Sequence, residues 1–154
     1  STEWRARANS KEELAIRLEE MRSESRELVL KIVRDLENQG VPPENIFIGG
    51  FSLGARVALD VALQDGAGSE IGGVLFLSGT TRDLDLDLLA ERSPLRIFVS
   101  HGKSDRVVGF GTAKKLVEKL ESSGHQVTFV EFKGGHHNTG EVIRGIAQFL
   151  NEAK

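Results

Sequence analysis

Hydrophobic positions near the start of the chain recur with the period of an α-helix. Ser10 is followed three residues later by Glu13, which is the form of a capping box. Apolar residues then recur every three or four positions, at Leu14, Leu18, Met21, Leu28, Ile32 and Leu36, with Val29 and Val33 beside them. Gly40 ends the stretch, and two prolines follow it. The pattern predicts one long amphipathic helix whose apolar stripe covers a face of a sheet.

Four short apolar runs follow, and helical stretches separate them. The runs are residues 46–49, 71–78, 95–100 and 127–132. Helical periodicity marks residues 53–63, 110–122 and 141–152. Residues 80–94 are acidic and predict a loop with a short helical turn, and His125 is expected in a surface turn. Strands that alternate with helices predict an α/β fold with a parallel sheet and right-handed crossovers.

The composition narrows the class of protein. A chain of 154 residues suits one domain over 1–154, with residues 1–9 as a loose N-terminal segment. The net charge of −3 argues against a nucleic-acid binder, which needs a basic face. The absence of cysteine excludes disulfides and thiolate chemistry. No apolar run approaches the roughly 20 residues that span a bilayer, and no signal peptide is visible, so the cytoplasm is the expected location.

A serine stands between two glycines where the first strand meets the second helix. The pattern Gly50-x-Ser52-x-Gly54 at such a corner is typical of a nucleophile elbow. The turn forces the serine backbone into a strained conformation, and we expect both glycines to be needed because side chains would clash there. The helix that follows directs its N-terminus at the hydroxyl. The Leu53 N–H is therefore placed to stabilise a developing oxyanion.

Two further candidates follow later strands, at the same edge of a parallel sheet. Asp105 comes after the third strand and His136 after the fourth. The chain order Ser, Asp, His is that of an α/β-hydrolase triad, in which the histidine is the general base and the aspartate orients it. The spacing alone also allows His137 as the base. A turn role for Ser52 and a helix-cap role for Asp105 are the structural alternatives.

A metal site is a weaker interpretation of the histidines. His101, His136 and His137 would have to converge, but adjacent histidines on an extended loop point apart, and no carboxylate stands at ligand spacing. We therefore expect His101 to pack or hydrogen-bond under the loop that carries the acid. No metal and no cofactor is predicted, and no phosphate-binding glycine fingerprint is present.

Three stretches together resemble the phospholipase/carboxylesterase family, which includes the acyl-protein thioesterases. They are GGFSLGA at 49–55, HGKSDRVV at 101–108 and FKGGH at 132–136. The resemblance implies Ser52, Asp105 and His136 as the triad, with short carboxylic esters or thioesters as substrates. The chain departs from the family pattern at Leu53, where glutamine is usual, at Ala55, where glycine is usual, and at Gly109, where proline is usual.

The largest departure precedes the elbow. Members of the family have several strands there and a His-Gly-x-Gly-type loop that supplies a second oxyanion donor, whereas only 51 residues precede Ser52 here. The expectation is a truncated α/β-hydrolase-like sheet of about four parallel strands, flanked by helices. Losing one oxyanion donor costs about 10²–10³-fold in rate, so activity is expected to be weak.

The same departure leaves the strand from Ile46 to Gly49 at an open edge, which predicts a homodimer through this strand or pairing with a complementing segment. The favoured hypothesis is a serine hydrolase that cleaves small esters or thioesters through an acyl-enzyme, with no nucleic-acid partner. The alternatives are a non-catalytic, truncated or engineered scaffold, or one half of an assembly.

Overall fold

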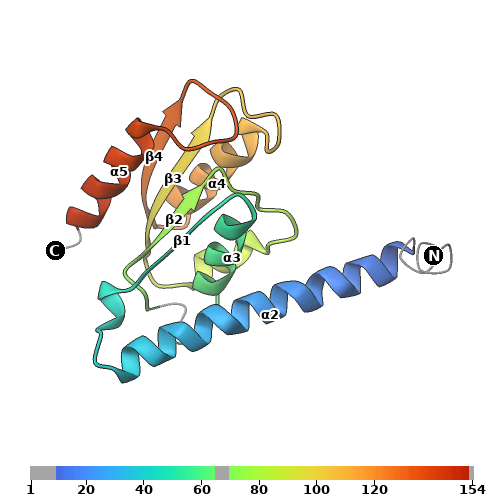
Figure 1. The fold of residues 1–154 in the computed structure, drawn as a ribbon, viewed down its shortest axis with the longest axis vertical. Coiled ribbons are helices and arrows are strands. Elements are labelled where there is room, and N and C mark those ends of the chain that lie inside the picture. The colour runs from blue at the N-terminus through green and yellow to red at the C-terminus, as the bar shows by residue number, and fades with distance from the viewer. Residues whose placement is uncertain (1–9, 65–69, 153–154) are drawn as a thin grey trace.

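The computed structural model describes residues 10–64 and 70–152, so the expected loose segment 1–9 lies outside the described residues. Four parallel strands form one sheet in the order β1-β2-β3-β4, as expected from the alternating pattern (Figure 1). The strands are β1 (Phe47–Phe51), β2 (Gly73–Leu77), β3 (Arg96–Gly102) and β4 (Gln126–Phe132). The helices are α2 (Lys11–Asn38), η1 (Pro43–Asn45), α3 (Leu53–Ala62), η3 (Leu86–Glu91), α4 (Phe110–Ser122) and α5 (Gly140–Asn151).

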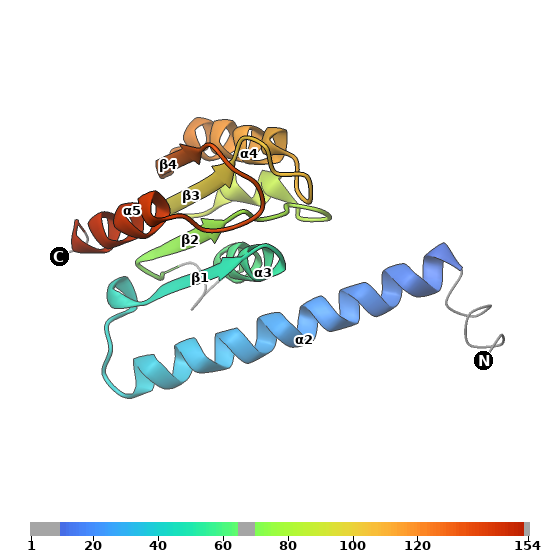
Figure 2. The same ribbon diagram turned by 45° about the horizontal axis from the view of Figure 1, so that its top comes forward.

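Helices cover both faces of the sheet. Alternate residues of β3 show this, because Ile97 and Val99 pack in the larger core with α3 and α4, while Phe98 packs with Phe149 of α5 on the opposite face. Figure 2 shows α4 and α5 on opposite sides of the strands. The continuous apolar runs of β2 and β3 follow from this arrangement, since both of their faces are buried.

The first helix begins as predicted but buries only part of the predicted stripe. The Glu13 N–H donates to Ser10 Oγ at 3.1 Å, as the capping box requires. The buried residues of α2 are Leu30 and Val33, and the helix packs on α3. Most of the predicted apolar stripe is instead exposed, namely Leu14, Leu18, Met21, Leu28 and Ile32. The prediction therefore holds only for the end of the stripe, where Val33 lies in the core and Leu36 packs against it, and α2 contacts α3.

His125 is buried, contrary to the expectation of a surface turn. Its exposed fraction is 6%, and its ring joins two segments. The Leu95 N–H donates to His125 Nδ1 at 3.0 Å, so the proton is on Nε2, which donates to the Leu89 carbonyl at 2.7 Å. The ring thus ties the residue before β3 to η3.

Replacing His125 by alanine is expected to lower the free energy of unfolding by about 2–3 kcal/mol, because two backbone groups lose their partners in a buried site. Urea unfolding followed by circular dichroism measures the change. Gln126→Ala is the matched control, since this neighbouring side chain is exposed. A loss no larger than that of the control would contradict the structural role of the ring.

Candidate active site

The nucleophile candidate occupies a strained corner between β1 and α3. Ser52 has φ 59° and ψ −114°, a conformation with positive φ that non-glycine residues rarely adopt. Its N–H donates to the Leu77 carbonyl at 2.8 Å, which holds the corner against the end of β2. Strain of this kind costs about 1–3 kcal/mol and is typical of functional sites. The corner lifts the hydroxyl above the carboxyl ends of the strands.

The two glycines of the elbow are not equivalent. A Cβ on Gly50 would lie 2.2 Å from the backbone carbon of Gly54, so no side chain fits there. A Cβ on Gly54 would meet no atom within 4 Å outside its own turn of helix. The expectation that both glycines are needed is therefore corrected. Gly50 is required because α3 turns back over it, whereas Gly54 already lies in α3 with open space beside it.

The acid candidate is buried in the loop after β3. The N–H groups of Val107 and Val108 both donate to Asp105 Oδ1, each at 2.8 Å. The other oxygen, Oδ2, accepts from His136 Nδ1 at 2.8 Å. The carboxylate side chain has no exposed surface. The two backbone donors fix its orientation and leave Oδ2 directed at the imidazole.

The histidine that completes the row comes from the loop after β4. His136 Nε2 lies 2.9 Å from Ser52 Oγ. Because a carboxylate only accepts, the proton of His136 is on Nδ1, and Nε2 accepts from the serine hydroxyl. The structure thus brings Ser52, His136 and Asp105 into one hydrogen-bonded row. His137 is exposed, and its ring lies against Phe132, 5.6 Å between centroids, outside this row.

Two neighbours support the row. The ring of Phe51 lies 4.8 Å from that of His136, and sequence reasoning missed this contact although Phe51 directly precedes the serine. His101 is fully buried, as expected for a residue under the acid loop. Its Nε2 donates to the Val108 carbonyl at 2.7 Å and lies 3.4 Å from Asp105 Oδ2. It therefore supports the same loop that holds the carboxylate.

The hydrogen bonds around Asp105 decide its charge. Burial by itself would raise the pKa of Asp105, but the bond from His136 and those from the Val108 and Val107 N–H groups outweigh it. The pKa of this carboxyl is therefore held below its ordinary value. The ionised form is the one that these donors stabilise, so the acid candidate is charged at neutral pH.

This pKa shift predicts how stability depends on pH. When folding lowers the pKa of a carboxyl, the carboxylate stabilises the folded protein at every pH above the ordinary aspartate pKa of about 4. That stabilisation is lost as the pH falls toward and through the lowered pKa of the folded state. The difference in free energy of unfolding between wild type and Asp105→Asn should therefore be largest near neutrality and shrink below about pH 4. Chemical denaturation across this range measures it. Asp35→Asn, at an exposed position of α2, is the matched control.

The described residues hold neither a metal site nor a membrane-spanning helix. Within residues 10–64 and 70–152, no three His, Cys, Asp or Glu side chains converge on a point where a metal ion could bind. Over the same residues, every helix is too short or too polar to cross a membrane.

Comparison with known proteins agrees with the motifs on which the site is built. The family model for phospholipase/carboxylesterase matches residues 9–154, nearly the whole chain. The chain belongs to the phospholipase/carboxylesterase family. Acyl-protein thioesterase 1 homolog 1 of Dictyostelium discoideum is 32% identical over 135 residues, 84% of this chain and 58% of that protein. Acyl-protein thioesterase 1 of Kluyveromyces lactis is 33% identical over 84% of this chain and 59% of its own length.

A solved structure shares the fold of this family member. Arabidopsis thaliana SOBER1 superposes with a TM-score of 0.74 at 25% identity, over 86% of this chain and 64% of its own. The match covers most of the described α/β sheet and its helices. The chain thus spans about three-fifths of the length of the relatives it matches.

Proposed function

We propose that the protein is a serine esterase or thioesterase whose catalytic triad is Ser52, His136 and Asp105. The observation that supports this most is the hydrogen-bonded row from Ser52 Oγ through His136 to Asp105 Oδ2, with distances of 2.9 and 2.8 Å. A row of this geometry lets an imidazole accept the hydroxyl proton while a buried carboxylate stabilises the imidazolium. Membership of the family supports ester or thioester cleavage as the reaction class.

The proposed reaction proceeds through an acyl-enzyme. Ser52 Oγ attacks the carbonyl carbon of the substrate while His136 Nε2 takes its proton. The tetrahedral intermediate collapses, the bond to the leaving alcohol or thiol breaks, and His136 returns the proton to that group. Water then attacks the acyl-serine with His136 again as base, which releases the acid and restores Ser52. Asp105 stays ionised throughout.

Oxyanion stabilisation is the limiting part of the proposal. Leu53 is the first residue of α3, so its N–H has no partner within the helix and adjoins the reacting hydroxyl. Residues 11–51 supply α2, η1 and β1, and no donor loop over Ser52 is among these elements. We propose that the Leu53 N–H is the oxyanion donor that this part of the chain supplies; losing such a donor costs about 10²–10³-fold in kcat.

Covalent labelling tests the nucleophile directly. A fluorophosphonate, which phosphonylates activated serines, is expected to modify wild type at Ser52, as located by peptide mass spectrometry, and to leave Ser52→Ala unmodified. Pre-incubation with a short nitrophenyl ester should slow the labelling. A protein that stays unlabelled at every concentration would favour a non-catalytic scaffold, whereas labelling only in concentrated solution would favour an assembly.

We also propose that two copies pair along β1. This strand ends the order of strands in the described sheet, so one row of its backbone groups faces outward. Beside it, Leu28 and Ile32 of α2 are 65% and 58% exposed. The charges around Leu28 favour a second copy of the chain as the partner. Two acidic residues precede Leu28 and two basic residues follow it, namely Glu24, Glu27, Lys31 and Arg34. An antiparallel two-fold arrangement would place acidic beside basic side chains.

Sedimentation velocity over a range of concentrations tests this pairing. Wild type is expected to dimerise, and Leu28→Lys should shift the equilibrium to the monomer by at least tenfold in dissociation constant. Ile143→Lys, another exposed apolar position on the remote α5, is the matched control. A monomeric wild type at the highest concentration would overturn the proposal.

A further inference from the structure

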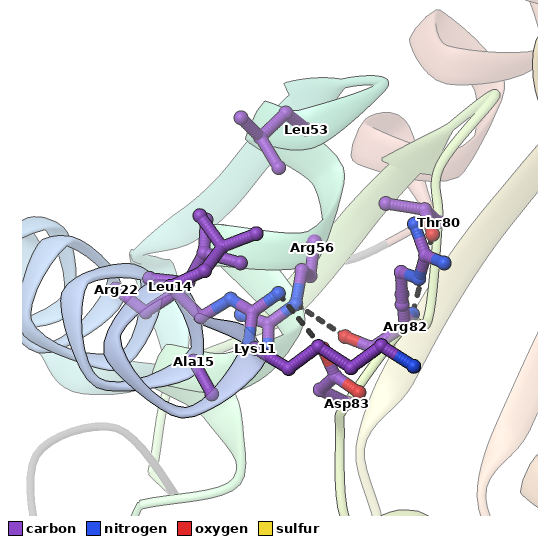
Figure 3. Close-up of a pocket in the computed structure, with 10 residues that line it drawn as sticks. Lys11, Leu14, Ala15, Arg22, Leu53, Arg56, Thr80, Arg82 and Asp83 are labelled. Carbon is purple, nitrogen blue, oxygen red and sulfur yellow. Dashed lines mark hydrogen bonds and ion pairs between the residues drawn. The ribbon is translucent and has the colours of Figure 1, made fainter. Parts of the chain in front are cut away.

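A cleft lined by cationic and apolar side chains lies beside the start of α3, the helix that follows the nucleophile in the chain. It has a volume of about 920 Å³ and is bounded by the N-terminal half of α2, the start of α3 and the loop after β2. Four cationic side chains line it, namely Lys11, Arg22, Arg56 and Arg82. Figure 3 shows the guanidinium groups of Arg22 and Arg56 close together, with that of Arg82 apart from them beside Thr80. The triad mechanism uses none of these charges.

Arg56 is the most unusual of these residues because its charge is buried. The residue is 3% exposed, and its Nε donates to the Arg82 carbonyl at 2.7 Å. Its Nη1 is buried without a hydrogen-bond partner among the described residues, and the nearest carboxylate oxygen, Asp60 Oδ2, is 3.9 Å away. Burial, and then the positive charge of Arg22, lower the pKa of Arg56. An unpartnered donor in a buried guanidinium favours an anion nearby.

The carboxylates present only partly balance the positive charge. Arg22 pairs with Asp83 at 3.1 Å, and Asp83 is the one acidic residue among the described residues that line the cleft. Asp60, which does not line the cleft, already forms an ion pair with Arg26 at 3.1 Å. The cleft therefore keeps an excess of cationic groups, and guanidinium groups suit the geometry of carboxylate and phosphate oxygens.

The rest of the cleft wall is apolar. Leu14, Leu18 and Leu53 line it and are 49%, 37% and 64% exposed. Leu53 directly follows Ser52 in the chain, so one end of this apolar wall is one residue from the nucleophile. A ligand that uses both surfaces has an apolar portion joined to an anionic end.

We propose that this cleft is a substrate subsite for a phosphate or carboxylate group carried on an apolar chain, held by Arg56, Arg82 and Lys11. The proposal rests on the proposed hydrolase function, because it places the anionic end of the substrate beside the scissile bond. The exposed Arg82 and Lys11 bind the oxygens, the buried guanidinium of Arg56 adds its positive charge behind them, and the leucines contact the chain. The cleft then selects amphiphilic anionic esters over neutral ones.

Equilibrium binding to Ser52→Ala protein tests the subsite independently of turnover. The probes are octyl phosphate below its micelle concentration, the neutral octyl glucoside, and inorganic phosphate, all at one ionic strength. Octyl phosphate should bind at least tenfold more tightly than either of the others. Since Arg56 anchors the loop after β2, the test variant is the double substitution Lys11→Gln and Arg82→Gln at exposed positions, which should weaken octyl phosphate binding at least tenfold. Lys114→Gln with Lys115→Gln, exposed on α4, is the matched control.

The outcomes separate this proposal from the triad. Octyl phosphate that binds no better than octyl glucoside, or equally well to the double variant, overturns the anionic subsite even if ester hydrolysis is intact. Inorganic phosphate that binds as tightly as octyl phosphate overturns the role of the apolar wall. Tight binding of octyl phosphate that the double variant weakens supports the subsite. If ester hydrolysis were unchanged in Ser52→Ala, the proposed nucleophile would be wrong, but this binding result would still support the subsite.

Discussion

Replacing Ser52 by alanine is expected to lower kcat for a short nitrophenyl ester by about 10⁴-fold or more, to a rate near that of the residual site. The expectation follows from the geometry, because the group that His136 Nε2 would deprotonate is the Ser52 hydroxyl, 2.9 Å away. Removing the hydroxyl removes the bond-forming atom and leaves only binding and the Leu53 N–H. Initial rates at saturating ester, corrected for spontaneous hydrolysis, measure the effect.

The control and the double variant make this result specific. Ser104→Ala changes an exposed serine in the acid loop and should retain most of the activity. Because members of a triad act as a unit, Ser52→Ala combined with His136→Ala should be no slower than the worse single variant. Equal rates for wild type and Ser52→Ala would exclude Ser52 as the nucleophile, and additive losses would argue against a coupled row.

The convergence of the three side chains was predictable from the chain because parallel strands bring their carboxyl ends to one edge. Ser52, Asp105 and His136 each follow a strand, so topology alone placed them together. The choice between His136 and His137 was not predictable from spacing, because it depends on the backbone of the loop after β4. There the Lys103 and Ser104 N–H groups donate to the Phe132 and Gly134 carbonyls, which fixes where the loop turns.

The orientation of α2 could not be predicted from its periodicity. Apolar residues at helical spacing indicate that one side of a helix is apolar, but they do not indicate which neighbouring element packs against that side. Leu30 and Val33 are buried, whereas Leu28 and Ile32 of the more regular stripe are exposed. The cationic cleft was equally invisible, because Lys11, Arg22, Arg56 and Arg82 come from three segments and follow no motif.

Replacing Gly50 by alanine is expected to destabilise the protein by about 3 kcal/mol and to abolish esterase activity, whereas Gly54→Ala should leave both nearly unchanged. The reason is the close approach of α3, since a Cβ at Gly50 would lie 2.2 Å from the carbon and 2.3 Å from the oxygen of Gly54. These are backbone atoms in the first turn of α3, so they can move away from a Cβ at Gly50 only if the turn between β1 and α3 opens. Such an opening would displace Ser52. Alanine also has the higher helix propensity, which favours Gly54→Ala slightly.

Urea unfolding and ester hydrolysis, measured on both variants, decide between two explanations of the Gly-x-Ser-x-Gly pattern. If the motif required two small residues for the strained serine itself, the two substitutions would be equally harmful. If instead the first glycine exists to let the helix pass, only Gly50→Ala should lower stability and activity. The φ of 59° at Ser52 is then maintained by the packing of α3 against β1, not by the flexibility of both flanking glycines.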